Sequence, residues 1–193
     1  MTPRSSWRTV DIVVTAAIAV AFGVVFYAWN FVWNSITPAF VAFPPAQNIF
    51  YGIWLLPAVL AALVVRKPGA ALFAELVAAS VSTILGSQWG LDTLLSGAIQ
   101  GAMAEIVFGA TLYSRFDAAT AAFAAMAEAF GAWIHDMVVY YKDLPLSDQI
   151  AIGGFMLLSA VLLGGLAAWW LARVLARSGV LAQFPSGREQ TRI

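Results

Sequence analysis

The chain has 193 residues, of which 62% are hydrophobic and only 10% are charged, whereas soluble domains carry roughly a quarter charged residues. This composition excludes a water-soluble fold, and the equal numbers of basic and acidic residues, 10 each, give no basic excess for binding nucleic acid. The absence of cysteine excludes disulfides, thiol catalysis and cysteine-ligated metal.

Six apolar segments follow one another, separated by clusters of proline, glycine and charged residues. We place them at about 10–33, 48–66, 69–86, 92–114, 118–141 and 148–175. A membrane-spanning helix needs about 20 apolar residues, and backbone at that depth must satisfy its own hydrogen bonds. The sequence therefore predicts an all-α membrane protein, a six-transmembrane-helix bundle that forms one integral-membrane domain over residues 1–193.

Basic residues mark one side of the predicted bundle. Nine of the ten lie before the first segment or at the ends of the second, fourth and sixth: Arg4, Arg8, Arg66, Lys67, Arg115, Arg173, Arg177, Arg188 and Arg192. By the positive-inside rule this side is cytoplasmic, so both termini are expected in the cytoplasm of a bacterial inner-membrane protein. The opposite side holds Lys142 and the rings of Trp29, Trp33, Trp89, Tyr140 and Tyr141, which form either an interfacial aromatic belt or part of a pocket.

Ionisable residues at membrane depth are costly and tend to mark a pathway or a binding site. Here they are Glu75 in the third segment, Glu105 in the fourth, Glu128 in the fifth, and the pair His135 and Asp136 near the outer end of the fifth. Neither Glu75 nor Glu105 has a basic residue within two turns of its own helix. The alternative for each acid is a protonated or water-bridged group satisfied by its neighbours.

Neutral polar and aromatic residues also gather in the outer half, namely Gln47, Asn48, Tyr51, Trp54, Gln88, Trp89 and Gln100. The spacing of three between Asn48, Tyr51 and Trp54 predicts a shared helix face. A pocket of rings and carboxylates without lysine or arginine favours a cationic or planar, electron-poor ligand. The apolar connection 34–47 either covers this pocket as a lid or lies in the headgroup region.

The residue patterns that several kinds of catalysis and metal binding require are absent from the sequence. The chain has no phosphate-binding loop of the G-x-x-x-x-G-K-[ST] type, no serine–histidine–aspartate spacing, and a single histidine. We therefore expect no enzyme activity, no cofactor and no metal site, and any ATP-driven transport needs another protein. Small residues at helical spacing, Ala17 and Ala21, serve either packing inside the bundle or docking of a membrane partner.

Three stretches carry a family resemblance: Trp54-Leu-Leu-Pro57, the run from Arg66 to Glu75 (RKPGAALFAE), and Gly86-Ser-Gln-Trp-Gly90. In these residues the chain resembles the YkoE-type substrate-binding (S) components of energy-coupling factor (ECF) transporters. The resemblance extends from Trp7 through the sixth segment. It implies a six-helix subunit that binds thiamin or its hydroxymethylpyrimidine precursor from outside. It also implies a transmembrane coupling protein (T component) driven by two ATPase subunits.

By this resemblance, Ala17 and Ala21 would form the coupling surface and Glu75 would belong to the substrate site. The other expected substrate contacts rest on the topology: Glu105, Trp54, Asn48, Tyr51, Gln88, Trp89, Gln100 and His135. A carboxylate, from Glu75 or Glu105, suits an aminopyrimidine because it accepts a hydrogen bond from the exocyclic amine and pairs with the ring nitrogen. The alternative function is a self-sufficient proton-coupled carrier for a small cationic or aromatic solute, with Glu75, Glu105 and Glu128 as the relay.

Overall fold

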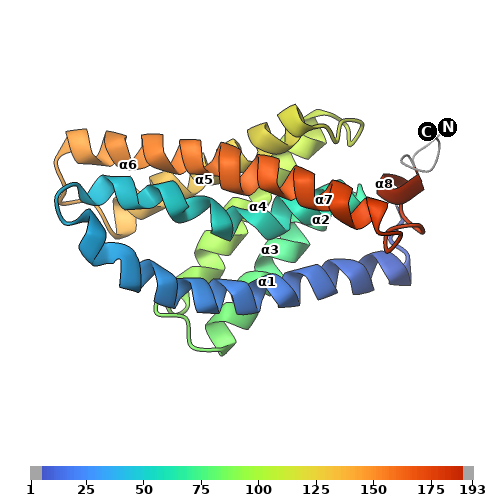
Figure 1. The fold of residues 1–193 in the computed structure, drawn as a ribbon, viewed down its shortest axis with the longest axis horizontal. Coiled ribbons are helices and arrows are strands. Elements are labelled where there is room, and N and C mark those ends of the chain that lie inside the picture. The colour runs from blue at the N-terminus through green and yellow to red at the C-terminus, as the bar shows by residue number, and fades with distance from the viewer. Residues whose placement is uncertain (1–5, 189–193) are drawn as a thin grey trace.

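The protein is an elongated bundle of helices (Figure 1). The computed structural model describes residues 6–188, and these contain no β-strand. The α-helices are α1 (Thr9–Ile36), α2 (Leu56–Val65), α3 (Ala70–Ile84), α4 (Asp92–Ala110), α5 (Ala118–Val139), α6 (Leu146–Ser159), α7 (Ala167–Arg177) and the short α8 (Pro185–Arg188). Two 3-10 segments, η1 (Thr37–Phe40) and η2 (Pro44–Leu55), and one π-helical segment, η3 (Ala160–Leu166), complete the described elements.

Five continuous helical stretches are long and apolar enough to cross a membrane: Thr9–Phe40, Pro44–Val65, Asp92–Ala110, Ala118–Val139 and Leu146–Arg177. The remaining predicted segment corresponds to α3, which has 15 residues and is a shorter apolar helix. The predicted all-helical membrane fold is therefore confirmed. Of the nine basic residues assigned to one side, Arg4 and Arg192 lie outside the described residues.

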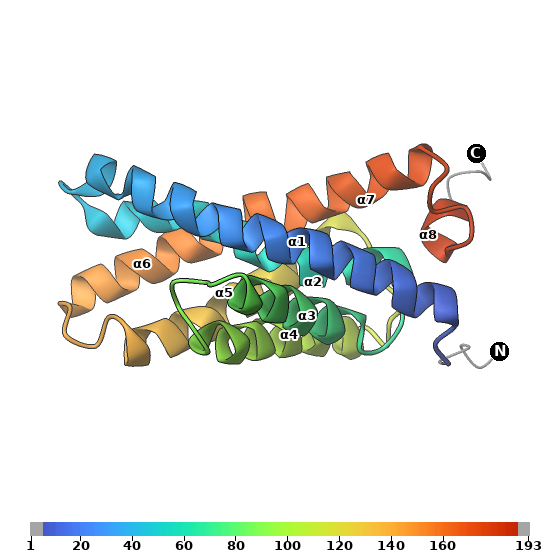
Figure 2. The same cartoon turned by 90° about the horizontal axis from the view of Figure 1, so that it is seen from below.

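The two ends of the bundle differ in character. We call the end where α1 begins and α7 finishes the basic end, because Arg8, Arg66 and Arg177 lie there. The other end, where α1 finishes and α4 begins, is called the aromatic end, after Trp33 and Trp89. Figure 2 shows α1 running the length of the bundle between α7 on one side and α3 and α4 on the other.

Helix α2 forms the centre of the bundle. All ten of its residues are buried, and it packs against α1, α3, α4, α5 and α7. Its sequence, LPAVLAALVV, is apolar all round, which is the pattern of a helix enclosed by other helices rather than of one facing solvent on one side. Alanine and glycine elsewhere permit close approach: a Cβ on Gly165 would lie 2.5 Å from the Cα of Ala122 in α5.

The connection between the first two apolar segments is more helical than we expected. We expected residues 34–47 to be a connection that covers the pocket or lies in the headgroup region, but α1 continues to Ile36, η1 follows, and η2 begins at Pro44. A 3-10 segment of 12 residues is unusually long. Contacts with the rest of the bundle support it, since the backbone N–H of Gly52 donates to Oγ of Ser159 in α6 at 2.8 Å.

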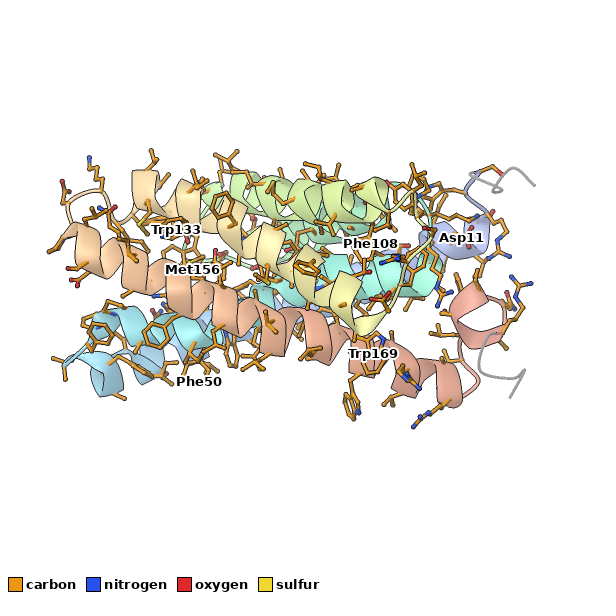
Figure 3. All side chains as sticks on the ribbon, turned by 90° about the horizontal axis from the view of Figure 1, so that it is seen from above. Asp11, Phe50, Phe108, Trp133, Met156 and Trp169 are labelled. Carbon is orange, nitrogen blue, oxygen red and sulfur yellow. The ribbon has the colours of Figure 1, made fainter. Side chains whose placement is uncertain are left out.

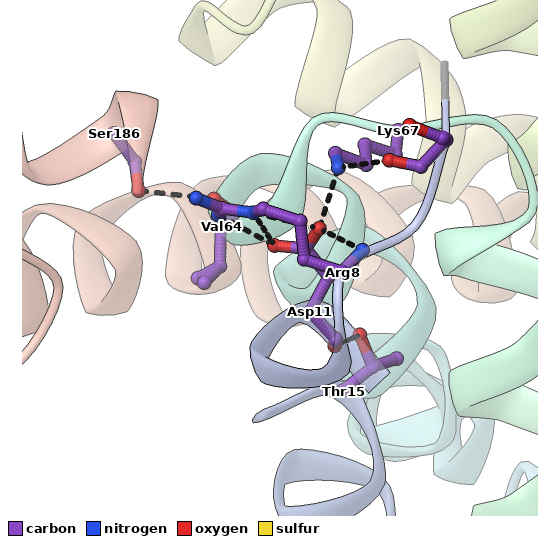
Figure 4. A network of polar contacts seen from close by, with 7 residues as sticks. Arg8, Asp11, Thr15, Val64, Lys67 and Ser186 are labelled. Carbon is purple, nitrogen blue, oxygen red and sulfur yellow. Dashed lines mark hydrogen bonds and ion pairs between the residues drawn. The ribbon is translucent and has the colours of Figure 1, made fainter. Parts of the chain in front are cut away.

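A buried acid ties the start of α1 to the α2–α3 turn (Figure 4). Asp11 is fully buried, and its carboxylate accepts hydrogen bonds from the side chains of Arg8 and Lys67, with Arg8 Nη2 at 2.7 Å. The indole of Trp7 donates to the carbonyl oxygen of Pro68 at 3.0 Å. These contacts fix the register of α1 against the α2–α3 turn.

Replacing Asp11 by asparagine should destabilise the basic end. The amide cannot pair with two cations, so we expect the free energy of unfolding to fall by about 1–2 kcal/mol. Thermal unfolding in detergent measures this, with Asp143→Asn in an exposed loop as the control. Equal melting temperatures for the two variants would show that the network contributes nothing to stability.

Candidate functional site

A cavity opens among α1, η2, α3, α4 and the end of α5, toward the aromatic end of the bundle. Most of its lining is aromatic, acidic or small, and no lysine or arginine within residues 6–188 contributes to it. The lining residues are Phe26, Trp33, Tyr51, Trp54, Glu75, Ala79, Trp89, Asp92, Thr93, Ser96, Gly97, Gln100, Asp136, Tyr140 and Tyr141. Three acids without a lining cation make the cavity attractive to a positively charged ligand.

One wall of the cavity is a group of aromatic rings. The ring of Trp54 lies 5.0 Å from that of Trp33 and 5.4 Å from that of Tyr51, measured between centroids. Tyr51 and Trp54 come from η2, and side chains three residues apart eclipse each other in a 3-10 helix, so both reach the same wall. On the other side, Trp89 and Tyr140 lie 5.1 Å apart. Such faces suit a planar or cationic ligand.

Glu75 is the deepest acid of the cavity. Its side chain is fully buried, and its Oε2 accepts a hydrogen bond from the backbone N–H of Ala58, in the first turn of α2, at 3.2 Å. Its Oε1 has no hydrogen-bond partner among the described residues. A buried acceptor without a partner is costly, so a ligand that donates a hydrogen bond here would satisfy it.

Glu128 lies behind Glu75 rather than in the cavity lining. It is fully buried in α5, and neither carboxyl oxygen has a hydrogen-bond partner within residues 6–188. The carboxyl groups of Glu75 and Glu128 are near enough to interact electrostatically.

A polar cluster joins α4 to the end of α5 at the mouth of the cavity. His135 lies between two acids, with Nδ1 2.9 Å from Oδ1 of Asp136 and Nε2 3.2 Å from Oδ1 of Asp92. The phenol of Tyr140 donates to the other oxygen of Asp92. Burial raises the pKa of Tyr141 to about 12, and burial together with Asp92 raises the pKa of Tyr140, so both phenols keep their protons at neutral pH.

Five of the expected substrate contacts line this cavity: Glu75, Trp54, Tyr51, Trp89 and Gln100. The amide of Gln100 donates to Oγ of Ser96 at 2.8 Å and to the hydroxyl of Tyr51 at 3.3 Å, which orients it in the wall.

Three further expected contacts lie outside the lining. His135 contacts the cavity only through Asp92 and Asp136, the two lining acids that its ring nitrogens approach. Asn48 is buried and donates to the carbonyl oxygen of Pro45 at 3.1 Å. Gln88 is exposed and accepts a hydrogen bond from Asn34.

Glu105 has a different setting from the one we expected. The structure places it near the basic end, where Oε1 accepts from the backbone N–H of Gly69 at 2.6 Å and Oε2 from that of Ala71 at 3.1 Å. The phenol of Tyr113 also donates to Oε1. These contacts satisfy the open N–H groups at the start of α3, so Glu105 acts as a helix cap contributed by a neighbouring helix.

Several residues that line the cavity are not among the substrate contacts expected from the sequence. Trp33, Tyr140 and Tyr141 were left between belt and pocket, and Asp92 was treated as a segment boundary. The signal for Asp92 was available: it begins one apolar segment, and Asp136 lies near the end of the next. Consecutive antiparallel helices bring those two ends together.

Known proteins resemble this chain over nearly its whole length. A family model described as "ABC-type cobalt transport system, permease component" matches residues 10–131. The protein YkoE of Bacillus subtilis (strain 168), whose name assigns it to HMP/thiamine permeases, is 33% identical over 185 residues, covering 95% of this chain and 92% of YkoE. A solved structure titled "Crystal structure of an S-component of ECF transporter" superposes with a TM-score of 0.91 at 32% identity, covering 97% of this chain and 94% of that one.

The family model and the helical bundle with its cavity define a membrane component of an ABC-type uptake system. More narrowly, the chain belongs to the YkoE family of S components of ECF transporters. Both relatives are transport proteins rather than enzymes, which confirms the expected class.

Proposed function

We propose that this S component takes up thiamin or its hydroxymethylpyrimidine precursor, which it binds in the cavity at the aromatic end. The observation that carries the proposal is the composition of that cavity: aromatic walls, three acids and no lining cation. The name of the relative YkoE points to the same two ligands. An anionic ligand would meet three carboxyl groups and no lining positive charge.

Glu75 and the aromatic rings would recognise different parts of the ligand. In the proposed complex, Oε1 of Glu75 accepts from the exocyclic amine of the pyrimidine, a contact of the charge-assisted type. The thiazolium of thiamin then lies against the aromatic wall, with Asp92 and Asp136 near its positive charge. The precursor lacks that cation and would use the pyrimidine contacts alone.

Isothermal titration of the purified chain, stripped of bound ligand, tests this proposal. Thiamin, hydroxymethylpyrimidine and the hydroxyethylthiazole fragment are titrated separately. Tight binding of thiamin or the precursor, with weak binding of the thiazole alone, is the expected result. If neither pyrimidine compound binds after verified stripping, the substrate assignment is wrong.

For the membrane arrangement, we propose that α3 is a sixth membrane segment and that the basic end faces the cytoplasm of a bacterial inner membrane. The whole chain then acts as one domain, with both termini cytoplasmic. Supporting this, the basic residues assigned to that side include Arg8, Arg66, Lys67, Arg115 and Arg177, whereas Lys142 lies at the aromatic end. In this proposal the chain works with a T component and with two ATPase subunits that supply the energy, as the likeness to a solved ECF S component supports.

The coupling surface is proposed on α1. Ala17 and Ala21 are both exposed. In the most apolar part of the Thr9–Phe40 stretch, only 28% of the residues are buried inside the bundle. A single turn separates the two alanines, so together they leave a shallow strip along which another helix can approach closely.

Substitution of Ala17 or Ala21 by tryptophan should block uptake without affecting ligand binding. The large ring would hold the partner helix away from the strip while leaving the cavity untouched. The checks are ligand titration of the isolated chain and uptake in cells that carry the coupling module. Ala110→Trp, at an exposed alanine that ends α4, is the matched control. Normal uptake by both α1 variants would place the docking surface elsewhere.

A further inference from the structure

A second cavity lies at the basic end of the bundle, remote from the proposed substrate site. It is bounded by the end of α2, the turn between α4 and α5, and α7. Three arginines line it, one from each of these elements: Arg66, Arg115 and Arg173. Trp169, labelled in Figure 3, and Phe116 provide its aromatic walls.

Two of the arginines lie over these aromatic walls. The guanidinium carbon of Arg66 is 4.8 Å from the ring centroid of Phe116, and that of Arg173 is 4.6 Å from the ring centroid of Trp169. Phe116 is itself stacked on the fully buried Phe108, with 5.8 Å between the centroids. A guanidinium over a ring remains able to donate through its edge, and its planar fork matches the oxygens of a phosphate.

The charge of this cavity is positive. Among the described residues its only lining acid is Asp117. That carboxylate already accepts from the backbone N–H of Thr120 at 2.8 Å and from its hydroxyl at 3.1 Å, as the N-cap of α5. Within residues 6–188, neither Arg115 nor Arg173 forms a salt bridge. The guanidinium groups of Arg115 and Arg173 thus face one negative charge that is engaged in capping.

The second cavity is formed by segments at the ends of membrane-crossing stretches. Its lining residues lie close in sequence to the ends of membrane-crossing stretches: Arg66 follows Val65, Arg115 lies between Ala110 and Ala118, and Arg173 precedes Arg177. Next to Trp169, the side chain of Trp170 is 62% exposed in the last third of the Leu146–Arg177 stretch, and exposed tryptophan rings near the ends of membrane helices are typical of the membrane interface. Basic pockets between helices at this level are suited to phospholipid headgroups.

We propose that the cavity lined by Arg66, Arg115 and Arg173 binds a phosphate group, and that an anionic phospholipid supplies it. The phosphate oxygens face the guanidinium groups of Arg115 and Arg173, and the acyl chains run along the exposed apolar side of α7. Because the substrate cavity lies toward the opposite end of the bundle, this proposal is independent of the identity of the vitamin.

Native mass spectrometry of the delipidated chain tests the proposal. The chain is incubated with phosphatidylglycerol or with phosphatidylcholine, and the fraction that retains lipid is measured. We expect at least a tenfold preference for phosphatidylglycerol, and its loss in the double variant Arg115→Gln/Arg173→Gln. Arg177→Gln, which removes a charge from the same helix outside the cavity lining, should keep the preference.

Inorganic phosphate provides the second arm, because it offers the same chemistry without a lipid. If millimolar phosphate displaces phosphatidylglycerol from the wild type but not from the double variant, the result would support the phosphate site itself. Phosphate binding without any lipid preference would overturn the lipid as its source. An unchanged preference in the double variant, or an equal loss in Arg177→Gln, would overturn the site. The variant Arg115→Lys/Arg173→Lys, which keeps the charges, should fold and retain part of the preference.

Discussion

Glu75→Gln is expected to weaken ligand binding by about 10- to 100-fold, because a hydrogen bond to a charged group contributes about 1.5–3 kcal/mol. The amide oxygen of glutamine can still accept from the N–H of Ala58, so the bond that Oε2 makes to α2 is preserved. The other position, where Oε1 now has no partner among the described residues, would present an amide N–H₂ to the ligand. Two donors would then face each other across the contact with the aminopyrimidine.

Titration of thiamin or the precursor against the variant measures this loss. Glu105→Gln is the matched control, since it makes the same chemical change in the same bundle but caps α3 outside the cavity. We expect that control to bind normally and to melt at a lower temperature. Normal binding by Glu75→Gln would remove Glu75 from the site, and impaired binding by Glu105→Gln alone would restore the expectation that the sequence raised for Glu105.

Gly52→Ala should strongly destabilise the bundle. A Cβ at this position would lie 2.4 Å from the carbonyl oxygen of Ser159 and 2.9 Å from Cβ of Leu163, so η2 and α6 would have to separate. Overpacking of this kind costs up to about 3 kcal/mol. Since Tyr51 and Trp54 flank Gly52 in the cavity wall, ligand affinity should fall together with stability.

Gly154→Ala is the matched control for this change. Gly154 also lies in a helix, α6, but a Cβ there meets no atom within 4 Å. Because alanine is the better helix former by about 1 kcal/mol, the control should be neutral or slightly stabilising. Thermal unfolding and ligand titration of both variants would decide the matter. Equal stability of Gly52→Ala and Gly154→Ala would mean that η2 and α6 can move apart without destabilising the protein.

The fold was largely predictable because the bilayer imposes a simple rule. Apolar runs near 20 residues must become helices, and charges, prolines and glycines mark their ends. The conformation of η2 was not predictable in this way. Its sequence, PPAQNIFYGIWL, has the length and apolarity of the start of a membrane helix, and nothing local distinguishes an α-helix from a 3-10 helix. The close contact of Gly52 with Ser159 involves residues more than 100 positions apart.

For the site, the sequence was informative where a charge lay deep in an apolar run and ambiguous elsewhere. Glu75 satisfied that criterion and lines the cavity; Glu105 satisfied it equally but caps α3 instead. The two differ only in which neighbouring helix their side chains meet, which is a property of the packed bundle. Asp92 lies at a segment end, where an acid needs no explanation, so its role at the cavity mouth depends on the pairing of α4 with α5.

Helix α2 spans the distance between the two cavities. The N–H of Ala58, in its first turn, is bonded to Glu75 in the floor of the aromatic-end cavity, and Arg66, directly after its last residue, walls the cavity at the basic end. Being enclosed along its whole length, this helix has no solvent-facing side that could yield independently. Helix α2 therefore connects the proposed substrate site and the proposed phosphate site through one continuous buried element, with Glu75 at its first turn and Arg66 directly after its last residue.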